Sequence, residues 1–164
     1  MDLYLIRHAE AQPLGENGIE EDEARPLTDA GRAQCQALSA ALQQCGVRPG
    51  RMLTSPLLRA KQTAETVLHH WAAPVPLLAE CELLAPGFKH RKLARYLKDL
   101  NEDVVAVVGH MPDLAEFAAW LIGSKKAQLD LDKAGVAGIR CQQGLDKGDG
   151  LLFWLVSPVW YKLT

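Results

Sequence analysis

Two strand-like segments of the chain end in residues that can do chemistry. Arg7 and His8 follow the apolar run 3–6, which is rich in strand formers and long enough for one buried strand. His110 comes shortly after the valine-rich run 104–108, a segment typical of a central parallel strand. Open α/β sheets bind ligands outside the carboxyl ends of their strands. A fixed cation and two imidazoles are therefore expected at one rim of a sheet.

Arg59 is a further candidate, because it lies about one turn into a predicted helix. Ser55 at the N-cap and Pro56 at the first helical position signal the start of this helix, directly after a short predicted strand over 51–54. The positive end of a helix dipole disfavours a cation there, unless an anion docks beside it. An arginine next to a helix N-terminus suits a phosphate group. An exposed arginine of no functional consequence is the alternative interpretation.

Together these four residues would form a cradle for an oxyanion with an imidazole nucleophile beside it. Arginines stabilise the charge that spreads over a transferring phosphoryl group. Arg7 and Arg59 also favour the neutral form of His8, which is the form that attacks. The arginines and a protonated His110 supply the positive charge, so neither a metal ion nor another cofactor is expected. The acidic run 20–23 is interpreted as a solvated loop, because no histidine interleaves with it.

The rest of the chain alternates strand and helix patterns, which favours right-handed βαβ units. Thr28 is a good N-cap for a helix whose apolar positions recur as far as Gly46. A basic tetrad at 89–92 opens another helix and is interpreted as a solvated helix start that can also meet an acidic partner. The other predicted elements are a strand over 75–78, a helix from Pro112 to Gly123, and an edge hairpin of strands 135–141 and 151–156.

Composition describes an ordinary soluble globular protein with one domain over residues 1–164. The chain is 48% apolar and 23% charged, with a formal net charge of -2, which argues against nucleic-acid binding through bulk charge. No apolar stretch approaches the ~20 residues that span a bilayer. No secretory signal opens the sequence, so a cytoplasmic protein is expected. The four cysteines form no C-x-x-C pair and are expected to be reduced.

Several motifs occur in an order that resembles the histidine phosphatase (phosphoglycerate-mutase-like) superfamily, and within it the short SixA-type phosphohistidine phosphatases. The resemblance implies a three-layer α/β/α sandwich around a mostly parallel sheet of about six strands. The motifs are Arg7-His8-Ala9, Arg25-Pro26-Leu27-Thr28, the segment 55–64 with Arg59, and Gly109-His110.

The same resemblance implies roles for individual residues. His8 would be the phosphorylated nucleophile, and Arg7, Arg59 and His110 would hold the phosphoryl group, with Arg25 also reaching the site. The signature Arg-His-Gly of the superfamily is Arg-His-Ala in this chain. The position of the usual carboxylic proton donor is left open between Glu82, Glu80 and no residue.

An unassigned acid bears on the substrate. An alkoxide needs a proton donor to leave, whereas imidazole, with a pKa of ~6.5, needs much less help. The leading hypothesis is therefore a metal-independent phosphatase that acts on a phosphohistidine-bearing protein through phospho-His8. The enzymatic alternative is a small-molecule phosphomonoesterase on the same site. The non-enzymatic alternative is a phosphate-dependent binding module, which would need the arginines but not both histidines.

Overall fold

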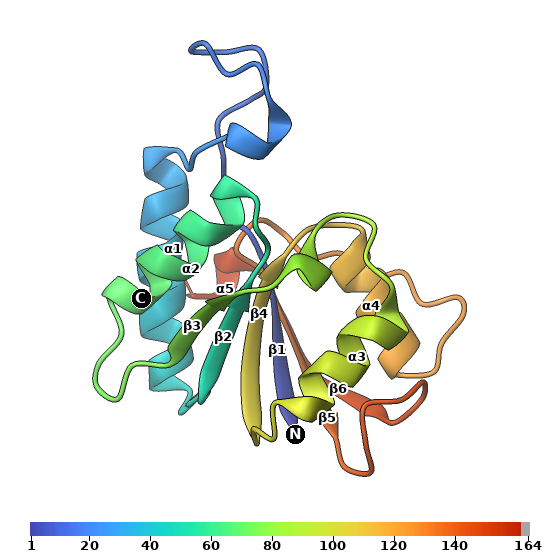
Figure 1. Ribbon diagram of the computed structural model, residues 1–164. Coiled ribbons are helices and arrows are strands. Elements are labelled where there is room, and N and C mark those ends of the chain that lie inside the picture. The colour runs from blue at the N-terminus through green and yellow to red at the C-terminus, as the bar shows by residue number, and fades with distance from the viewer. Residues whose placement is uncertain (162–164) are drawn as a thin grey trace.

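The computed structural model describes residues 1–161, which form a six-stranded sheet between two layers of helices (Figure 1). The last three residues of the predicted domain, 162–164, lie outside the described part. In sheet order the strands are β3 (Leu77–Glu80), β2 (Arg51–Thr54), β4 (Val104–Gly109), β1 (Asp2–Arg7), β5 (Val136–Cys141) and β6 (Gly150–Val156). The first four run parallel, and β5 is antiparallel to both of its neighbours. The predicted fold class, including the edge hairpin, is confirmed.

Strand register aligns the ends of the central strands. Arg7 in β1 is paired with Gly109 in β4, and Thr54 in β2 is paired with Val108. The backbone N–H of His8 then donates to the Gly109 carbonyl at 3.0 Å. The residues that follow β1, β2 and β4 consequently leave the sheet at one rim.

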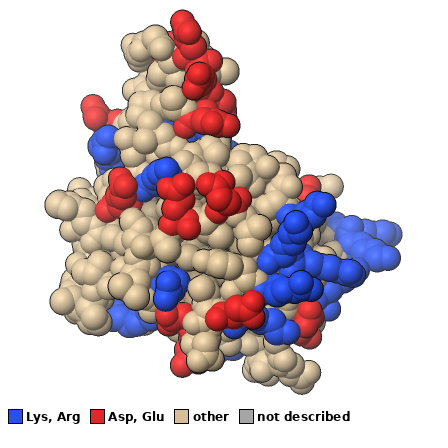
Figure 2. Space-filling view, in the orientation of Figure 1, with Lys and Arg blue, Asp and Glu red and all other residues tan. Residues whose placement is uncertain are grey.

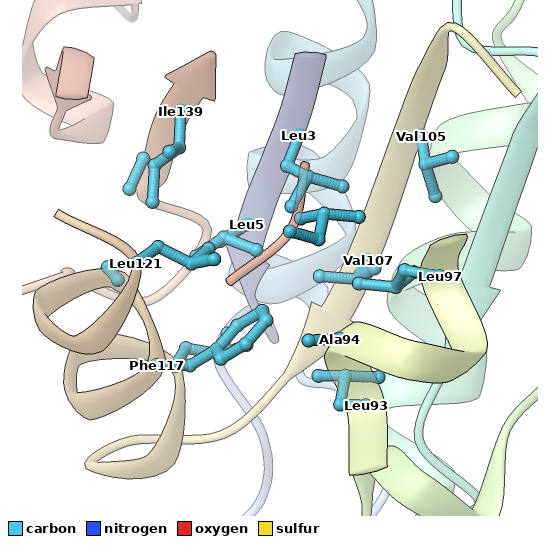
Figure 3. Packing of buried hydrophobic residues seen from close by; sticks show 14 of the residues in the cluster. Leu3, Leu5, Leu93, Ala94, Leu97, Val105, Val107, Phe117, Leu121 and Ile139 are labelled. Carbon is cyan, nitrogen blue, oxygen red and sulfur yellow. The ribbon is translucent and has the colours of Figure 1, made fainter. Parts of the chain in front are cut away.

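Helices cover both faces of the sheet. One layer contains α1 (Asp29–Gln44), α2 (Leu58–His69) and the short α5 (Pro158–Tyr161), and the other contains α3 (His90–Asp99) and α4 (Asp113–Leu121). Side chains of β1 alternate between two cores, as a strand buried on both faces requires. Leu3 and Leu5 pack with α3 and α4, whose apolar side chains converge on them in Figure 3. Tyr4 and Ile6 pack with α1 and α2.

The loop between β1 and α1 projects beyond the rim of the sheet (Figure 1). It contains a short 3₁₀ helix, η1 (Asp22–Ala24), and carries acidic side chains that are visible on this projection in Figure 2. A second 3₁₀ helix, η2 (Glu82–Leu84), follows β3. These two turns and α5 were not predicted from the sequence. Within residues 1–161, no helix is long and apolar enough to cross a membrane.

Two predicted boundaries are wrong. The strand predicted over 75–78 is shifted to β3 (Leu77–Glu80), because Pro76 has no N–H to donate and regular pairing with β2 begins with Leu77. Helix α2 begins at Leu58 rather than after a Ser55 cap, and its N-cap is Leu57. The Ser55 hydroxyl lies instead beside a histidine of the rim. Thr28 does cap α1, since its hydroxyl accepts the Gly31 N–H at 3.0 Å.

Candidate active site

Three of the predicted residues meet at the rim of the sheet. His8 follows β1, His110 follows β4, and Arg59 is the second residue of α2. Arg59 Nε donates to His8 Nε2 at 3.3 Å, and the two imidazole centroids are 5.2 Å apart. All three side chains are buried, with exposed fractions of 8% for His8, 6% for Arg59 and 4% for His110. The structure therefore places an imidazole nitrogen, a guanidinium group and a second imidazole within one small volume.

A backbone carbonyl fixes which nitrogen of His8 carries the proton. Nδ1 lies 2.7 Å from the Ala9 carbonyl oxygen, and because a carbonyl only accepts, Nδ1 is the protonated nitrogen. Nε2 then presents a lone pair towards Arg59. Burial lowers the pKa of His8 to about 4, and the charges of Arg59 and Arg7 act in the same direction against the Ala9 bond. His8 is thus neutral near pH 7, in the form that can attack phosphorus.

His110 is held by the serine that precedes α2. Its Nε2 lies 2.7 Å from Ser55 Oγ, and its buried Nδ1 has no hydrogen-bond partner within residues 1–161. Burial, followed by the neighbouring His8 and Arg59, lowers the pKa of His110 to about 3. The prediction of a protonated His110 is therefore wrong for the free protein, because desolvation outweighs any benefit from the charged form.

Arg7 reaches the site from the end of β1. Its Nη1 donates to the Leu131 carbonyl at 2.7 Å, while its buried Nε has no hydrogen-bond partner in the described part of the chain. A buried donor without a partner costs about 1–3 kcal/mol. Arg7 Nε is such a donor at this rim, and the buried His110 Nδ1 is a second polar atom without a partner. The oxygens of a phosphoryl group would satisfy donors of this kind, which fits an oxyanion cradle.

Asp22 in η1 connects two arginines across the mouth of the site. Its Oδ2 accepts Arg59 Nη2 at 3.0 Å, its backbone carbonyl accepts Arg59 Nη1 at 2.7 Å, and its Oδ1 accepts Arg25 Nη1 at 2.9 Å. The bond from Arg25 and the charge of Arg59 lower the pKa of Asp22. Run 20–23 is exposed, as expected of a solvated loop, but the pairing of Asp22 with Arg25 and Arg59 was not predicted from the sequence. Its one sequence signal is the spacing of three residues between Asp22 and Arg25.

Arg25 lies at the outer edge of this group. Its Nε donates to the Gln12 carbonyl at 2.6 Å, in addition to the Asp22 ion pair, which is partly exposed. Its charge is one of the causes that lower the pKa of His8. The structure thus brings Arg25 near the site through Asp22, and it does not place the Arg25 guanidinium against His8 itself.

Thr63 ties α2 to the segment that follows His8. Its hydroxyl donates to the Arg59 carbonyl at 2.7 Å and accepts the Ala9 N–H at 3.0 Å. The Arg59 and His8 backbones are therefore linked through one buried side chain. Thr63 is part of the motif read from the sequence, but its bridging role cannot be read there, because the contact spans 54 residues.

Within residues 1–161, neither of the two glutamates considered as proton donors forms a hydrogen bond or ion pair with a residue of the cradle. Glu80 Oε2 pairs with Lys61 Nζ at 2.6 Å, and the Glu82 side chain is exposed in η2. The carboxylate that contacts Arg59 is that of Asp22, whose charge also acts to raise the pKa of His110. Within residues 1–161, no group of three or more His, Cys, Asp and Glu side chains could hold a metal ion.

Comparison with known proteins defines the class. Residues 3–83 match the model of the histidine phosphatase superfamily (branch 1). The chain is 36% identical to an uncharacterized protein of Picosynechococcus sp., with 98% of each chain covered. It is 27% identical to the phosphohistidine phosphatase SixA of Escherichia coli (strain K12), over 100% of this chain and 98% of that one. A structure of the protein histidine phosphatase SixA complexed with tungstate superposes over 100% of both chains, with 25% identity and a TM-score of 0.85.

The chain belongs to the histidine phosphatase superfamily and is a phosphatase. Within the superfamily it is of the SixA type.

Proposed function

We propose that this phosphatase hydrolyses phosphohistidine on a protein, without a metal ion, through a phosphorylated His8. The observation that carries the proposal is the state of His8: neutral, with Nδ1–H bound to the Ala9 carbonyl and Nε2 beside Arg59 Nε at 3.3 Å. In the first step the Nε2 lone pair forms a bond to phosphorus, and the N–P bond of the substrate breaks. The substrate imidazole departs with the electron pair of that bond.

In the second step a water oxygen attacks phosphorus and the bond to His8 Nε2 breaks, which releases inorganic phosphate and restores the lone pair. The Ala9 carbonyl keeps Nδ1 protonated throughout, so His8 leaves as a neutral imidazole. Arg59 and Arg7 balance the charge on the phosphoryl oxygens, and His110 can hydrogen-bond one of them through Nδ1. A phosphohistidine substrate protonated on its other nitrogen departs in the same way, so neither step requires a carboxylic acid.

Substrate choice follows from the leaving groups. An alkoxide would need a proton from a nearby acid, and the carboxylate beside the cradle, that of Asp22, is engaged by Arg59 and Arg25 with a lowered pKa. A lowered pKa keeps Asp22 ionised and makes it a poor proton donor at pH 7. This favours phosphohistidine over a small phosphomonoester.

The direct test compares release of phosphate from a histidine-phosphorylated carrier domain and from a panel of phosphomonoesters, with and without EDTA. We expect faster turnover of phosphohistidine, no loss with EDTA, and an acid-labile phosphoenzyme in wild type. His8→Ala should abolish turnover and labelling. His69→Ala, at the exposed far end of α2, is the matched control and should retain both. Release from monoesters alone would replace the proposed substrate, and inhibition by EDTA would overturn the metal-free mechanism.

A further inference from the structure

A groove opens beside the candidate active site, on the face of the sheet that α3 and α4 cover. Its volume is about 480 Å³, and its lining includes Met111 and Pro112, the two residues that follow His110. The opposite wall is the segment after α4, including residues 127–129. That segment continues to Leu131, whose carbonyl binds Arg7. Both walls of the groove therefore lead directly to residues of the cradle.

The lining combines apolar side chains with cations at the edge. Met111, Ala115, Ala119, Trp120 and Leu129 supply apolar surface. The charged lining residues are Lys125 and Lys147, with one carboxylate, Glu116, on α4. Both lysines are exposed. Neither lysine forms an ion pair within residues 1–161.

Further cations extend this edge along α3. Helix α3 begins at His90, which lines the groove. Exposed basic residues lie on both sides of His90 in the basic tetrad, and another follows one helical turn after the tetrad. The positive end of a helix dipole disfavours cations in the first turn, and α3 has no acidic residue there to offset them. Figure 2 shows the resulting concentration of Lys and Arg over α3 and the neighbouring loop, although the chain carries a net charge of -2. These basic residues are Lys89 at the N-cap of α3 and Arg91, Lys92 and Arg95 within the helix.

We propose that this groove and its basic edge form the docking surface for an acidic face of the phosphohistidine-bearing protein. The inference rests on the proposed function, since a small phosphorylated molecule would need only the cradle. Apolar side chains of the partner would occupy the groove, and aspartates or glutamates around its phosphohistidine would face Lys125, Lys147 and α3. Complementary charge of this kind raises the rate of encounter and discriminates between partners.

The test uses two synthetic phosphohistidine peptides with the same apolar residues, one with glutamates around the phosphohistidine and one with lysines in their place. Phosphoramidate, a small N–P compound that cannot fill the groove, reports the chemistry alone. We expect wild-type kcat/KM to be at least about tenfold higher for the acidic peptide, with a preference that weakens as salt is added. Lys125→Glu/Lys147→Glu should remove the preference and leave phosphoramidate turnover unchanged.

The matched control is Arg48→Glu/Arg140→Glu, which changes the net charge equally away from the groove. Arg140 pairs with Asp2 at the opposite end of β1 from the site, and Arg48 precedes β2. This variant should keep the acidic preference. Equal kcat/KM for both peptides in wild type, or a preference that survives in the groove variant, would overturn the docking surface. Turnover of phosphoramidate without turnover of either peptide would instead overturn the proposed substrate, and the docking surface with it.

Discussion

At His8, one hydrogen bond decides which nitrogen reacts. The Ala9 carbonyl accepts the hydrogen bond from Nδ1–H of His8, so the other ring nitrogen, Nε2, presents its lone pair to Arg59. Ala9 replaces the glycine of the family signature, and its backbone is engaged at both ends, by His8 and by Thr63. The methyl group is fully buried and leaves both bonds in place. The change from glycine is therefore compatible with the same orientation of the nucleophile.

At the same scale, Asp22 is expected to position the arginines rather than to react. It binds Nη1 and Nη2 of Arg59 and leaves Nε directed at His8. Asp22→Asn would keep the backbone bond and weaken the ion pair, which for a half-exposed carboxylate contributes about 1 kcal/mol or less. We expect kcat/KM for phosphohistidine to fall by about fivefold.

Steady-state kinetics with Glu23→Gln as the control checks this expectation, because Glu23 lies in the same 3₁₀ helix and is exposed. The control should match wild type. A rise in kcat/KM for Asp22→Asn would mean that the carboxylate competes with the substrate phosphoryl group instead of orienting Arg59.

At the scale of elements, the sequence predicts that the site residues lie at one rim, but it does not predict the hydrogen bonds that orient their side chains. His8 and His110 could be assigned to one rim because they follow buried strand patterns, and parallel strands end at the same edge. The Ser55 contact with His110 could not be predicted, because the local pattern indicates a helix cap and the true partner is 55 residues away. Asp22 was missed for the same reason, since an exposed acidic run looks solvated until its partner on α2 is known.

A close approach between α1 and the segment after β1 gives an element-scale prediction. Gly31 lies against Glu10, and a Cβ at position 31 would overlap the Glu10 carbonyl. Gly31→Ala must therefore push α1 away from the chain that follows His8. We expect a loss of about 2 kcal/mol in the free energy of unfolding, as for other overpacked contacts, together with reduced phosphatase activity. Urea unfolding and phosphatase kinetics measure the two effects. The control Gln36→Ala, on the exposed side of α1, should change neither the free energy of unfolding nor the activity.

At the scale of the whole molecule, charge is separated although the net value is small. The projecting loop after β1 is acidic, and the face over α3 is basic (Figure 2). The sequence reveals both charged runs but not their arrangement, because Lys125 and Lys147 join the α3 cations only through the packing of the loops beside α4. The net charge of -2 therefore does not predict the basic edge of the groove.

Buried neutral histidines also make global stability depend on pH. Burial lowers the pKa of His8 to about 4 and of His110 to about 3, whereas both would titrate near ~6.5 in the unfolded chain. Between these values the unfolded state binds more protons, so the free energy of unfolding falls as the pH is lowered from about 6.5 towards 4. Each histidine contributes about 2 kcal/mol of this loss by pH 5. Urea unfolding at pH 7.5 and 5 measures it, and His8→Asn should show a shallower pH dependence than wild type. Equal slopes in the two proteins would contradict the buried neutral state of His8.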